Sequence, residues 1–493
     1  MVLVLLLLTP LLASGLCWLV PRPRWLEGIT LASSGLSLGW AGLAAGHLIS
    51  NSHLEAMGGW LYADALSGVT LLVTVFVGFT AALFSIGYLR EDIRGADLTR
   101  DEARGRLRIY YTLFNLFLFS MLVVPVTNSL GVLWIAIEGT TLASLFLVSF
   151  YGTQEALEAA WKYIIVGSVG IALGLFGTIL TYYSAVRVLG TSYDLNWSLL
   201  VPVAPQLNPD VMRLALLFIV VGYGTKAGLA PMHTWLPDAH SEAPSPISAL
   251  LSGVLLNCAM YAILRFYALA TPSIGRRYPD GLLLGFGLLS LLVATVFILR
   301  QRDYKRLLAY SSVEHMGIIA IGVAFGGALG LSGALFQLIN HAVTKSLMFF
   351  ASGHVLLRYG TKEIRRVSGI LQVLPVSGVM LVLGGLALTG APPFGIFASE
   401  LTIFGAGFRN GHAPAAAAAL GLVALAFVGF LRSLNQLVFG TAPPGIPVGE
   451  ASLSGLVAMG VSLVLVLGLG LVVPAPLATL VGQAAAVLAG GPQ

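Results

Sequence analysis

Residues 222–231 read GYGTKAGLAP and interrupt an apolar stretch of the chain with three glycines, a proline and Lys226. A second apolar stretch is interrupted in a similar way at 388–395, which read LTGAPPFG, and Glu400 follows that interruption. Glycine and proline in the middle of a membrane-spanning helix free backbone hydrogen-bonding groups, which is tolerated only where protein or water satisfies them. If the chain spans a membrane, the two interruptions predict broken helices; the simpler alternative is a pair of ordinary proline kinks.

The composition places the chain in a membrane. Hydrophobic residues make up 57% of its 493 residues, the mean hydropathy is +0.91, and 10% of the residues are charged, against roughly 25% in a soluble domain. So little charge cannot cover the surface of a soluble protein of this length, which excludes a soluble enzyme, a nucleic-acid binder and a disordered chain. The net charge of +5 does not indicate nucleic-acid binding, because the basic residues stand in short loops between apolar segments.

Apolar segments of roughly 20 residues, the length that crosses a bilayer as a helix, recur along the chain. We therefore predict an all-α polytopic membrane protein with about 14 transmembrane helices. The first segment, 1–20, has its basic residues after the apolar run, so we predict a retained span and not a signal peptide. The other predicted spans lie near 28–50, 64–89, 109–127, 129–150, 160–186, 212–232, 245–270, 281–299, 309–327, 330–357, 374–408, 414–438 and 453–475.

The charge of the loops predicts the orientation. The loops that follow odd-numbered spans carry roughly three times as many Lys and Arg residues as the loops on the other side, and positive residues mark the cytoplasmic side. The loops on the poorer side carry Arg187, Arg213, Arg276, Arg277 and Arg409. The sequence thus predicts a multi-pass protein of the cell inner (plasma) membrane, with its N-terminus outside and its basic loops in the cytoplasm.

The two interruptions fall at equivalent places in a predicted internal repeat. Residues 109–270 and 281–440 would each form a five-helix unit with the interruption in its fourth helix, and an odd number of helices inverts one unit relative to the other. Residues 1–108 then form an N-terminal three-helix segment with a cytoplasmic loop, and 441–493 a C-terminal helix. Transporters built from inverted repeats commonly place the ion path at such broken helices.

Ionisable side chains inside the predicted spans are the candidate functional residues. Each costs roughly 3 kcal/mol at the bilayer centre, so each needs a reason to be there. In the eleventh span, Gln337, His341 and Lys345 recur at four-residue spacing and share one face of the helix. The predicted proton pathway consists of Glu138, Lys226, His315, His341, Lys345 and Glu400.

Each of these residues alone has a structural explanation. Glu138 and Lys226 can form an ion pair that only holds helices together, and His315 or His341 can be a hydrogen-bonded core histidine. The row as a whole favours proton transfer, because every member titrates and water can bridge the gaps between them. Lys226 would hold its proton while Glu138 is near and ionised, and release it more readily once that carboxylate is neutralised or moves away.

Four further residues are predicted to support the pathway. Gln337 belongs to the polar face of the eleventh span, and Asn257 lies in the eighth. Lys162 stands at the cytoplasmic start of the sixth span, where the plainer explanation is an ammonium that reaches the interface. His233 follows the first interruption and can equally be a helix cap or a loop residue.

We predict no cofactor and no metal in this chain. Its two cysteines, Cys17 and Cys258, stand far apart in apolar segments, no CxxC motif occurs, and the histidines lack metal or haem spacing. If the protein takes part in redox chemistry, the electrons pass through another chain.

Several separated motifs resemble a known family. KAGLAPMHTWLPDAHSEAPSPISALLSG at 226–253, YKRLLAYSSVEHMGI at 304–318, INHAVTKSLMFFASG at 339–353 and GAPPFGIFASE at 390–400 resemble the antiporter-like subunits of respiratory complex I and their relatives. The resemblance extends over roughly 60–440. Residues 138–165, EGTTLASLFLVSFYGTQEALEAAWKYII, and 312–317, SVEHMG, are most similar to the hydrogenase-4 component F branch, the membrane subunits of energy-converting NiFe hydrogenases.

The resemblance implies roles for the buried row as well as two inverted five-helix repeats. Glu138 matches the family's key glutamate of the fifth helix, Lys226 the lysine of the broken seventh, His341 and Lys345 the central positions of the eleventh, and Glu400 the ionisable residue of the broken twelfth. Many relatives carry a lysine in the eighth helix where this chain has Asn257, so water or His315 would have to bridge that gap. Glu314 stands where many relatives have a small polar residue.

The function that follows is that of a proton-translocating membrane subunit of a multi-subunit redox-driven complex. The implied partners are other membrane subunits and a peripheral redox arm that carries iron–sulfur clusters and NiFe, with the lipid bilayer around them and no nucleic acid. Two alternatives remain: a subunit of a multi-subunit cation/proton antiporter, and a proton-channel partner of an inorganic-carbon uptake complex. The sequence does not distinguish protons from sodium as the transported ion. A purely structural anchor is disfavoured by the energetic cost of the buried ionisable groups.

Overall fold

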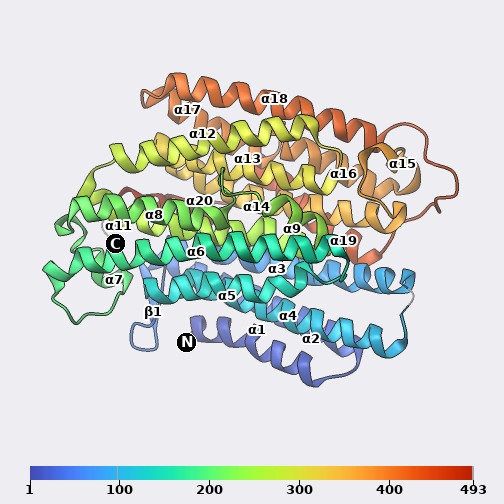
Figure 1. Ribbon diagram of the computed structural model, residues 1–493, viewed down its shortest axis with the longest axis horizontal. Helices are drawn as coiled ribbons and strands as arrows, with labels where there is room; N and C mark the ends of the chain where they lie inside the picture. Colours follow the sequence, from blue (N-terminus) through green and yellow to red (C-terminus); the bar gives the residue numbers. More distant parts are fainter. Residues whose placement is uncertain (97, 491–493) are drawn as a thin grey trace.

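The protein is a bundle of long helices that run side by side. The computed structural model describes residues 1–96 and 98–490, and most helices lie along its longest axis (Figure 1). The first part contains α1 (Val2–Leu19), α2 (Pro23–Ser50), β1 (His53–Ala56), β2 (Leu61–Asp64), α3 (Ala65–Gly95), α4 (Arg100–Val126), α5 (Leu130–Val148), α6 (Gln154–Leu189), α7 (Trp197–Leu200), a 3-10 turn (Ala204–Gln206), α8 (Pro209–Ala227) and α9 (Leu236–Glu242). The second part contains α10 (Ser245–Leu250), a π-helical turn (Leu251–Leu255), α11 (Leu256–Ile274), α12 (Arg277–Arg300), α13 (Tyr304–Phe325), α14 (Gly327–Tyr359), a 3-10 turn (Ile364–Arg366), α15 (Ile370–Val373), α16 (Pro375–Leu388), α17 (Gly395–Arg409), α18 (Ala413–Val438), α19 (Leu453–Leu471) and α20 (Ala475–Ala489).

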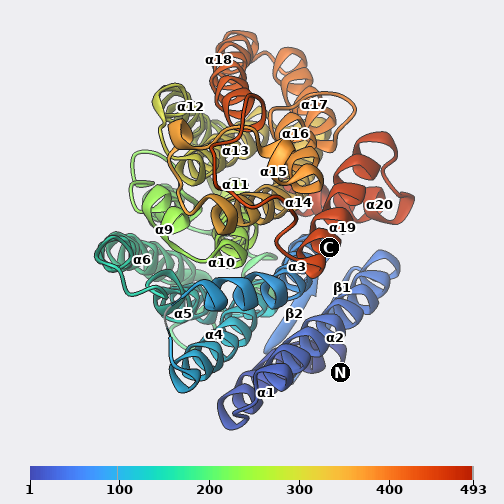
Figure 2. The ribbon, with the colours of Figure 1, turned by 90° about the vertical axis from the view of Figure 1, so that its right-hand side faces the viewer.

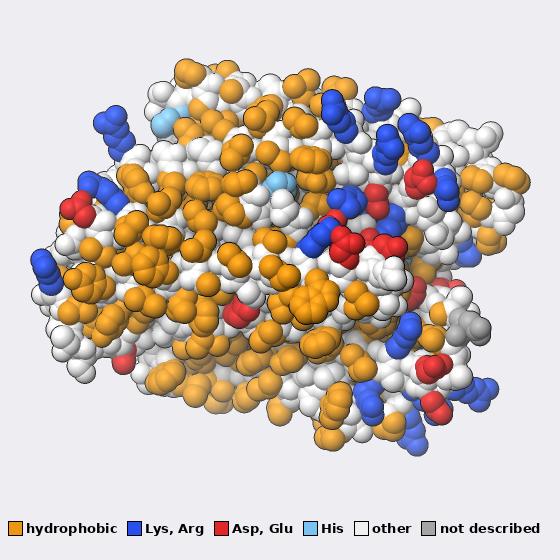
Figure 3. Space-filling model, in the orientation of Figure 1, with side chains coloured by type: hydrophobic (Ala, Val, Ile, Leu, Met, Phe, Trp, Pro, Cys, Tyr) orange, Lys and Arg blue, Asp and Glu red, His pale blue; other side chains and the backbone are white. Residues whose placement is uncertain are grey.

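The predicted helical membrane fold is confirmed. Ten helices of the described residues are long and apolar enough to cross a membrane. Apolar side chains cover the middle of the face shown in Figure 3, and most Lys and Arg side chains gather toward one end, where α3 ends and α4 begins. We call this the arginine-rich end. The exact number of spans, predicted as about 14, and the division into repeats stay predictions.

Short polar side chains fix where many helices begin. Thr99 accepts from the backbone N–H of Glu102, whose own side chain returns to Thr99, so α4 begins with a complete capping box. Thr153 caps α6, Asn208 caps α8 and Asp303 caps α13 in the same manner. The chain therefore pairs local start signals with apolar segments, as a helix bundle requires.

Both predicted interruptions are present. Helix α8 ends at Ala227 and is capped by Gly228, whose positive φ of 77° suits a residue without a side chain. The chain does not resume a helix until Leu236. The second interruption separates α16, which ends at Leu388, from α17, which begins at Gly395. Each interruption contains a cis peptide bond, at Ala230–Pro231 and at Pro392–Pro393.

A third interruption was not predicted from the sequence. The segment expected as one C-terminal helix consists of α19 and α20, separated by three residues that end with Pro474. The proline has no N–H to continue a helix, which explains the break. Gly470, in the last turn of α19, packs directly on the Pro393 carbonyl and on Phe394, so a side chain at this position would collide with the second interruption.

Helix α14 lies at the centre of the second half of the bundle (Figure 2). It packs against α3, α13, α16, α17, α19 and α20, and its residues from Gln337 to Val355 are buried without a gap. The polar face of α14 therefore meets other helices and not lipid. Its partners decide what its ionisable residues can do.

Candidate functional site

The first group of buried charges lies where α8 is interrupted. Lys226, in the last turn of α8, is fully buried, and its Nζ donates to the Thr141 hydroxyl and to the Tyr163 hydroxyl, 3.3 Å away. The Thr141 hydroxyl in turn donates to Glu138 over 3.3 Å. Lys226 and Glu138 therefore communicate through one hydroxyl that lies between them, which refines the direct pair expected from the sequence.

Aromatic rings and a glycine complete the pocket of Lys226. Its Nζ lies 4.4 Å from the centre of the Tyr163 ring and 5.9 Å from that of Trp235, so two π faces stabilise the ammonium. Gly167 of α6 faces the same atom, and a Cβ there would lie 3.2 Å from it. The glycines of α6 thus let α8 approach closely, as small residues commonly do between membrane helices.

The second group joins α13, α14 and the second interruption. His315 of α13 donates from Nε2 to the carbonyl of Leu388, 3.1 Å away, and its Nδ1 lies 2.9 Å from the amide nitrogen of Gln337. A carbonyl only accepts, so Nε2 carries a hydrogen and Nδ1 accepts from Gln337, which describes a neutral ring. The interruption frees the Leu388 carbonyl, and a titratable side chain satisfies it.

His341 and Lys345 occupy the next two turns of α14. The ring centre of His341 lies 5.3 Å from that of His315, and both of its nitrogens are buried without a hydrogen-bond partner among the described residues. Lys345 is fully buried and donates to the carbonyl of Leu308, 2.6 Å away, and to the hydroxyl of Ser311. An ammonium has three hydrogens to donate, so this site has room for one more acceptor.

Sequence reasoning gave too small a role to Glu314. This side chain is 8% exposed and shares a cavity of about 10 Å³ with Ser311 and Glu400, close to the volume that holds one water. Lys345 donates to Ser311, which lines the same cavity. Ser311 therefore joins Lys345 to the cavity that Glu314 shares with the predicted end of the row. The position of Glu314 next to His315 in the sequence could have indicated that Glu314 belongs to the same buried group.

The supporting residues lie in different surroundings. Asn257 donates to the backbone carbonyls of Gly253 and Leu338, so it holds the π-helical turn against α14. His233 is buried beside Tyr310, and its Nδ1 has no partner among the described residues. Lys162 has a side chain that is 48% exposed and pairs with Glu158 and Asp238, outside the buried row.

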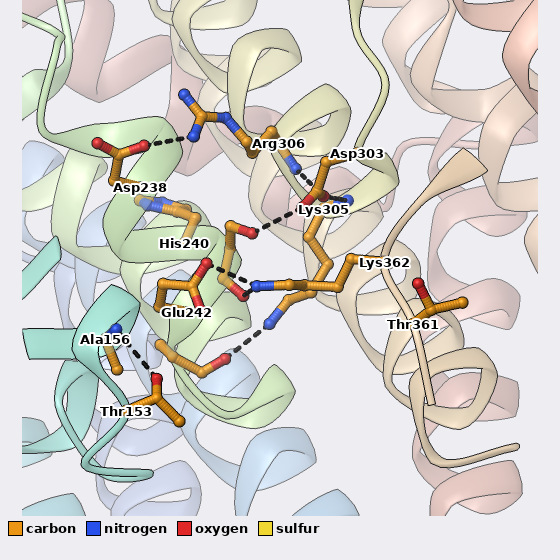
Figure 4. A network of polar contacts seen from close by, with 12 residues as sticks. Thr153, Ala156, Asp238, His240, Glu242, Asp303, Lys305, Arg306, Thr361 and Lys362 are labelled. Carbon is orange, nitrogen blue, oxygen red and sulfur yellow. Dashed lines mark hydrogen bonds and ion pairs between the residues drawn. The ribbon is translucent and has the colours of Figure 1, made fainter. Parts of the chain in front are cut away.

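Ion pairs join the two halves at the arginine-rich end. Figure 4 shows α9 facing the start of α13 and the segment that follows α14. Asp238 pairs with Arg306 at 2.7 Å and Glu242 with Lys362 at 2.6 Å, while the Lys305 ammonium donates to the carbonyl of Ala243. His240 lies behind these pairs, between Trp235 and Phe349, and so between the surroundings of Lys226 and those of α14.

A buried ion pair between α3 and α11 was also missed from the sequence. Asp64 caps α3 and holds Arg265 of α11 through two hydrogen bonds of 2.5 and 2.7 Å, and both side chains are at most 4% exposed. The Arg265 guanidinium also lies 4.6 Å from the centre of the Trp197 ring. The pair fastens the N-terminal helices to α11, away from both interruptions. Among the described residues, no group of three or more His, Cys, Asp or Glu side chains could hold a metal ion.

Interrupted helices that keep ionisable side chains buried define a multi-pass membrane protein with the architecture of an ion translocator. Comparison with known proteins gives the family. Residues 127–426 match the family described as NADH:quinone oxidoreductase/Mrp antiporter, transmembrane, and the chain belongs to this family. It is 42% identical over 396 residues to the hydrogenase-4 component F homolog of Methylacidiphilum infernorum, which covers 80% of this chain and 81% of the relative.

Solved structures agree with this assignment. A chain of the membrane-bound sulfane sulfur reductase, an archaeal respiratory membrane complex, is 26% identical with a TM-score of 0.87, and the match covers 99% of this chain and 97% of the other. A chain of the Mrp complex from Dietzia sp. has the same fold at 22% identity, with a TM-score of 0.85 and the same coverage. A chain of respiratory complex I from Thermus thermophilus, 24% identical, has a TM-score of 0.76 and covers 96% of this chain and 97% of its own. The predicted resemblance is confirmed.

Proposed function

We propose that this chain is a proton-translocating membrane subunit of a multi-subunit redox-driven complex. The observation that carries the proposal is a series of titratable groups that reaches both interruptions. The partly exposed Glu138 begins the series, and its other members are buried: Lys226, His315, His341, Lys345 and Glu400. Its members approach one another through hydroxyl groups: Thr141 stands between Lys226 and Glu138, and Ser311 lies beside Lys345, Glu314 and Glu400. A hydroxyl donates and accepts at once, so it can pass a proton without holding a charge.

The first group would work as a charge-controlled switch. While Glu138 is ionised, Thr141 turns its hydrogen toward the carboxylate and its lone pairs toward the Lys226 ammonium, which favours the protonated lysine. Neutralising Glu138 removes that preference and releases a proton from Lys226 toward the second half of the molecule. His240, buried between Trp235 and Phe349, lies on the side from which such a transfer would proceed.

The surface around Glu138 supports membrane partners. Glu138 is partly exposed between α5 and α6, whereas its neighbours on this face, Ile135, Leu142 and Phe146, are exposed apolar side chains. A carboxylate that faced lipid would be costly, so another membrane subunit would cover this face and offer Glu138 a donor. The structural relatives come from multi-subunit membrane complexes.

The orientation and the redox partner also belong to the proposal. The arginine-rich end would face the cytoplasm of a cell whose inner membrane holds the protein, with the N-terminus on the opposite side. Iron–sulfur clusters and NiFe would reside in a peripheral arm, since the name of the relative from Methylacidiphilum infernorum refers to a hydrogenase. This chain would supply only the proton path.

A subunit of a multi-subunit cation/proton antiporter is the second candidate. The fold shared with a chain of the Mrp complex favours it, and sodium could then replace one of the moving protons. Purification in mild detergent, with identification of the chains that accompany this protein, separates the two. A chain with redox centres supports the first function, whereas small membrane chains alone support the second.

The proton path itself is tested with Lys226→Met. Methionine keeps the length and apolar stem of the side chain but cannot be protonated. In inverted membrane vesicles that contain the whole complex, electron transfer and dye-reported proton uptake are measured together. We expect assembled complex with proton uptake at least about tenfold lower. Lys362→Met, which removes a lysine paired outside the row, serves as the control; unchanged uptake in Lys226→Met would reject Lys226 as a relay member.

A further inference from the structure

A carboxylate and two tyrosines form a continuous hydrogen-bonded line at the arginine-rich end. Asp92, near the end of α3, is partly exposed, and its Oδ1 accepts from the Tyr151 hydroxyl at 3.4 Å. The Tyr151 hydroxyl lies 2.9 Å from that of Tyr88, which is fully buried one turn earlier in α3. Residues four apart share a helix face, so α3 presents both ends of the line to Tyr151, which stands in the α5–α6 connection.

The inner end of this line reaches the first residues of α10. The Tyr88 hydroxyl lies beside Ser245, whose hydroxyl is buried without a partner among the described residues. Ser245 packs on Gly353 of α14, where a Cβ would lie 2.7 Å from that of the serine. Gly353 is eight residues from Lys345, or roughly 12 Å along the helix. The line therefore points from the rim of the molecule toward the central helix.

Lys305 is a second buried titratable group near this line. The residue is 1% exposed, and its ammonium donates to the carbonyl of Ala243, two residues before Ser245. Lys305 and the partly exposed Arg106 are both near enough to act electrostatically on Asp92. The carboxylate thus has one buried and one partly exposed cation in its surroundings. Such a position suits a group that collects a proton outside and releases it inward.

A plain structural tie between α3 and the α5–α6 connection does not explain all of these features. A tie needs one hydrogen bond, which a serine or an asparagine would supply. This line instead joins a titratable group at the rim to two tyrosine hydroxyls, and it leads to the buried hydroxyl of Ser245, which has no hydrogen-bond partner among the described residues. Burial raises the pKa of the Tyr151 phenol well above its ordinary value, so the phenol keeps its hydrogen. It can therefore accept from one neighbour while donating to the other.

We propose that Asp92, Tyr151 and Tyr88 form the proton entrance of this chain at its arginine-rich end. This proposal rests on the proposed proton-translocating function. The Asp92 carboxylate takes a proton from water. It then passes this proton to the Tyr151 oxygen as Tyr151 gives its own to Tyr88. Tyr88 gives its own to the hydroxyl of Ser245, and Ser245 releases its hydrogen to an internal water on the side of α14. Each oxygen gains one hydrogen as it loses one, so no charge remains on a tyrosine. Rotation of the hydroxyls resets the line.

Asp92→Asn and Tyr151→Phe test the entrance in vesicles that contain the whole complex. Asp92→Asn keeps an oxygen that accepts from Tyr151 but removes the titratable group, and Tyr151→Phe removes the middle hydroxyl but keeps the ring. For each we expect normal electron transfer with proton uptake lowered about tenfold. Asp92→Glu should restore most of the uptake. Asp101→Asn is the matched control, because that carboxylate belongs to the neighbouring α4 and is 94% exposed.

The outcomes separate the entrance from the function as a whole. Wild-type uptake in both Asp92→Asn and Tyr151→Phe, with uptake still lost in Lys226→Met, overturns the entrance and leaves the proposed function standing. Equal loss in Asp92→Glu and Asp92→Asn shows a structural role and also overturns it. If Asp92→Asn prevents assembly, Tyr88→Phe decides, since it leaves the contact between Asp92 and Tyr151 in place. Uptake that survives in Lys226→Met as well contradicts the proposed function itself.

Discussion

The two predicted interruptions solve the same backbone problem with different chemistry. At the first, the Trp235 indole donates to the carbonyl of Thr225 over 2.8 Å, and the N–H of Ala230 donates to the Ser290 hydroxyl. At the second, the imidazole of His315 donates to the carbonyl of Leu388. An indole cannot lose or gain a proton in the physiological range, whereas an imidazole can.

This difference assigns different tasks to the two sites. The first interruption has a fixed geometry, and its titratable group, Lys226, stands beside the break without holding it together. At the second, protonation of His315 would change the bond with Gln337, because Nδ1 would then need an acceptor and the Gln337 oxygen already accepts from Ser399. If protons pass through His315, as we propose, their movement would be coupled to the shape of the second interruption and not to that of the first.

The largest expected effect comes from His315→Leu. This variant leaves the Leu388 carbonyl buried and unsatisfied, which costs about 1–3 kcal/mol in the free energy of unfolding, and it also removes a member of the row. We expect a lower melting temperature of the purified complex and proton uptake reduced about tenfold. His315→Gln separates the two, because its amide can donate to Leu388 but cannot titrate. Recovery of uptake in His315→Gln would contradict the coupling.

Trp235→Phe should show the opposite pattern at the first interruption. Phenylalanine keeps an aromatic face near Lys226 but loses the donor to Thr225, whose carbonyl still accepts from the N–H of Gly228. The free energy of unfolding should therefore fall by about 0.5–1.5 kcal/mol. We expect proton uptake per assembled complex to remain within about twofold of the wild type, since the indole takes no part in proton transfer. A loss of proton uptake as large as that of His315→Leu would show that both interruptions, and not the second alone, take part in proton transfer.

The third interruption offers a way to disturb the second without touching a titratable group. In Gly470→Ala the new methyl group meets the Pro393 carbonyl, and α19 must move away from the start of α17. We expect a loss of about 1–3 kcal/mol in stability and a reduction of proton uptake of about twofold. Gly468→Ala, on the same helix, has open space around the added methyl and should match the wild type in both measurements. A wild-type result for Gly470→Ala would show that α19 does not constrain the interruption.

Much of the fold was readable from the sequence because a bilayer imposes simple rules. Apolar length predicted helices such as α5 and α13, and the Gly-Pro clusters predicted both interruptions, since each of these features is local. The break between α19 and α20 was missed because a proline at the end of an apolar run predicts the end of a helix. It does not show whether a second helix follows.

The types of residue in the candidate site could be predicted from the sequence, but their contact partners could not. The polar face of α14 follows from four-residue spacing, whereas the bridge through Thr141 and the place of Glu314 depend on how separate helices pack. Asp92 and Tyr151 lie 59 positions apart, and sequence patterns along one helix cannot relate them. Only the packed helices show that a rim carboxylate faces a tyrosine from another element.

Lys162→Ala should have the smallest effect, and it tests whether the row extends to the surface of the first half. Its ammonium pairs with Glu158 at 2.6 Å and Asp238 at 3.1 Å, yet the side chain is 48% exposed, so water and salt screen both pairs. Asp238 also keeps its contact with Arg306 when the lysine is removed. We expect a melting temperature within about 1 °C of the wild type and unchanged proton uptake in the same vesicles. A clear loss of uptake would instead make Lys162 a proton donor to the Lys226 group, and the first half would then have an entrance of its own.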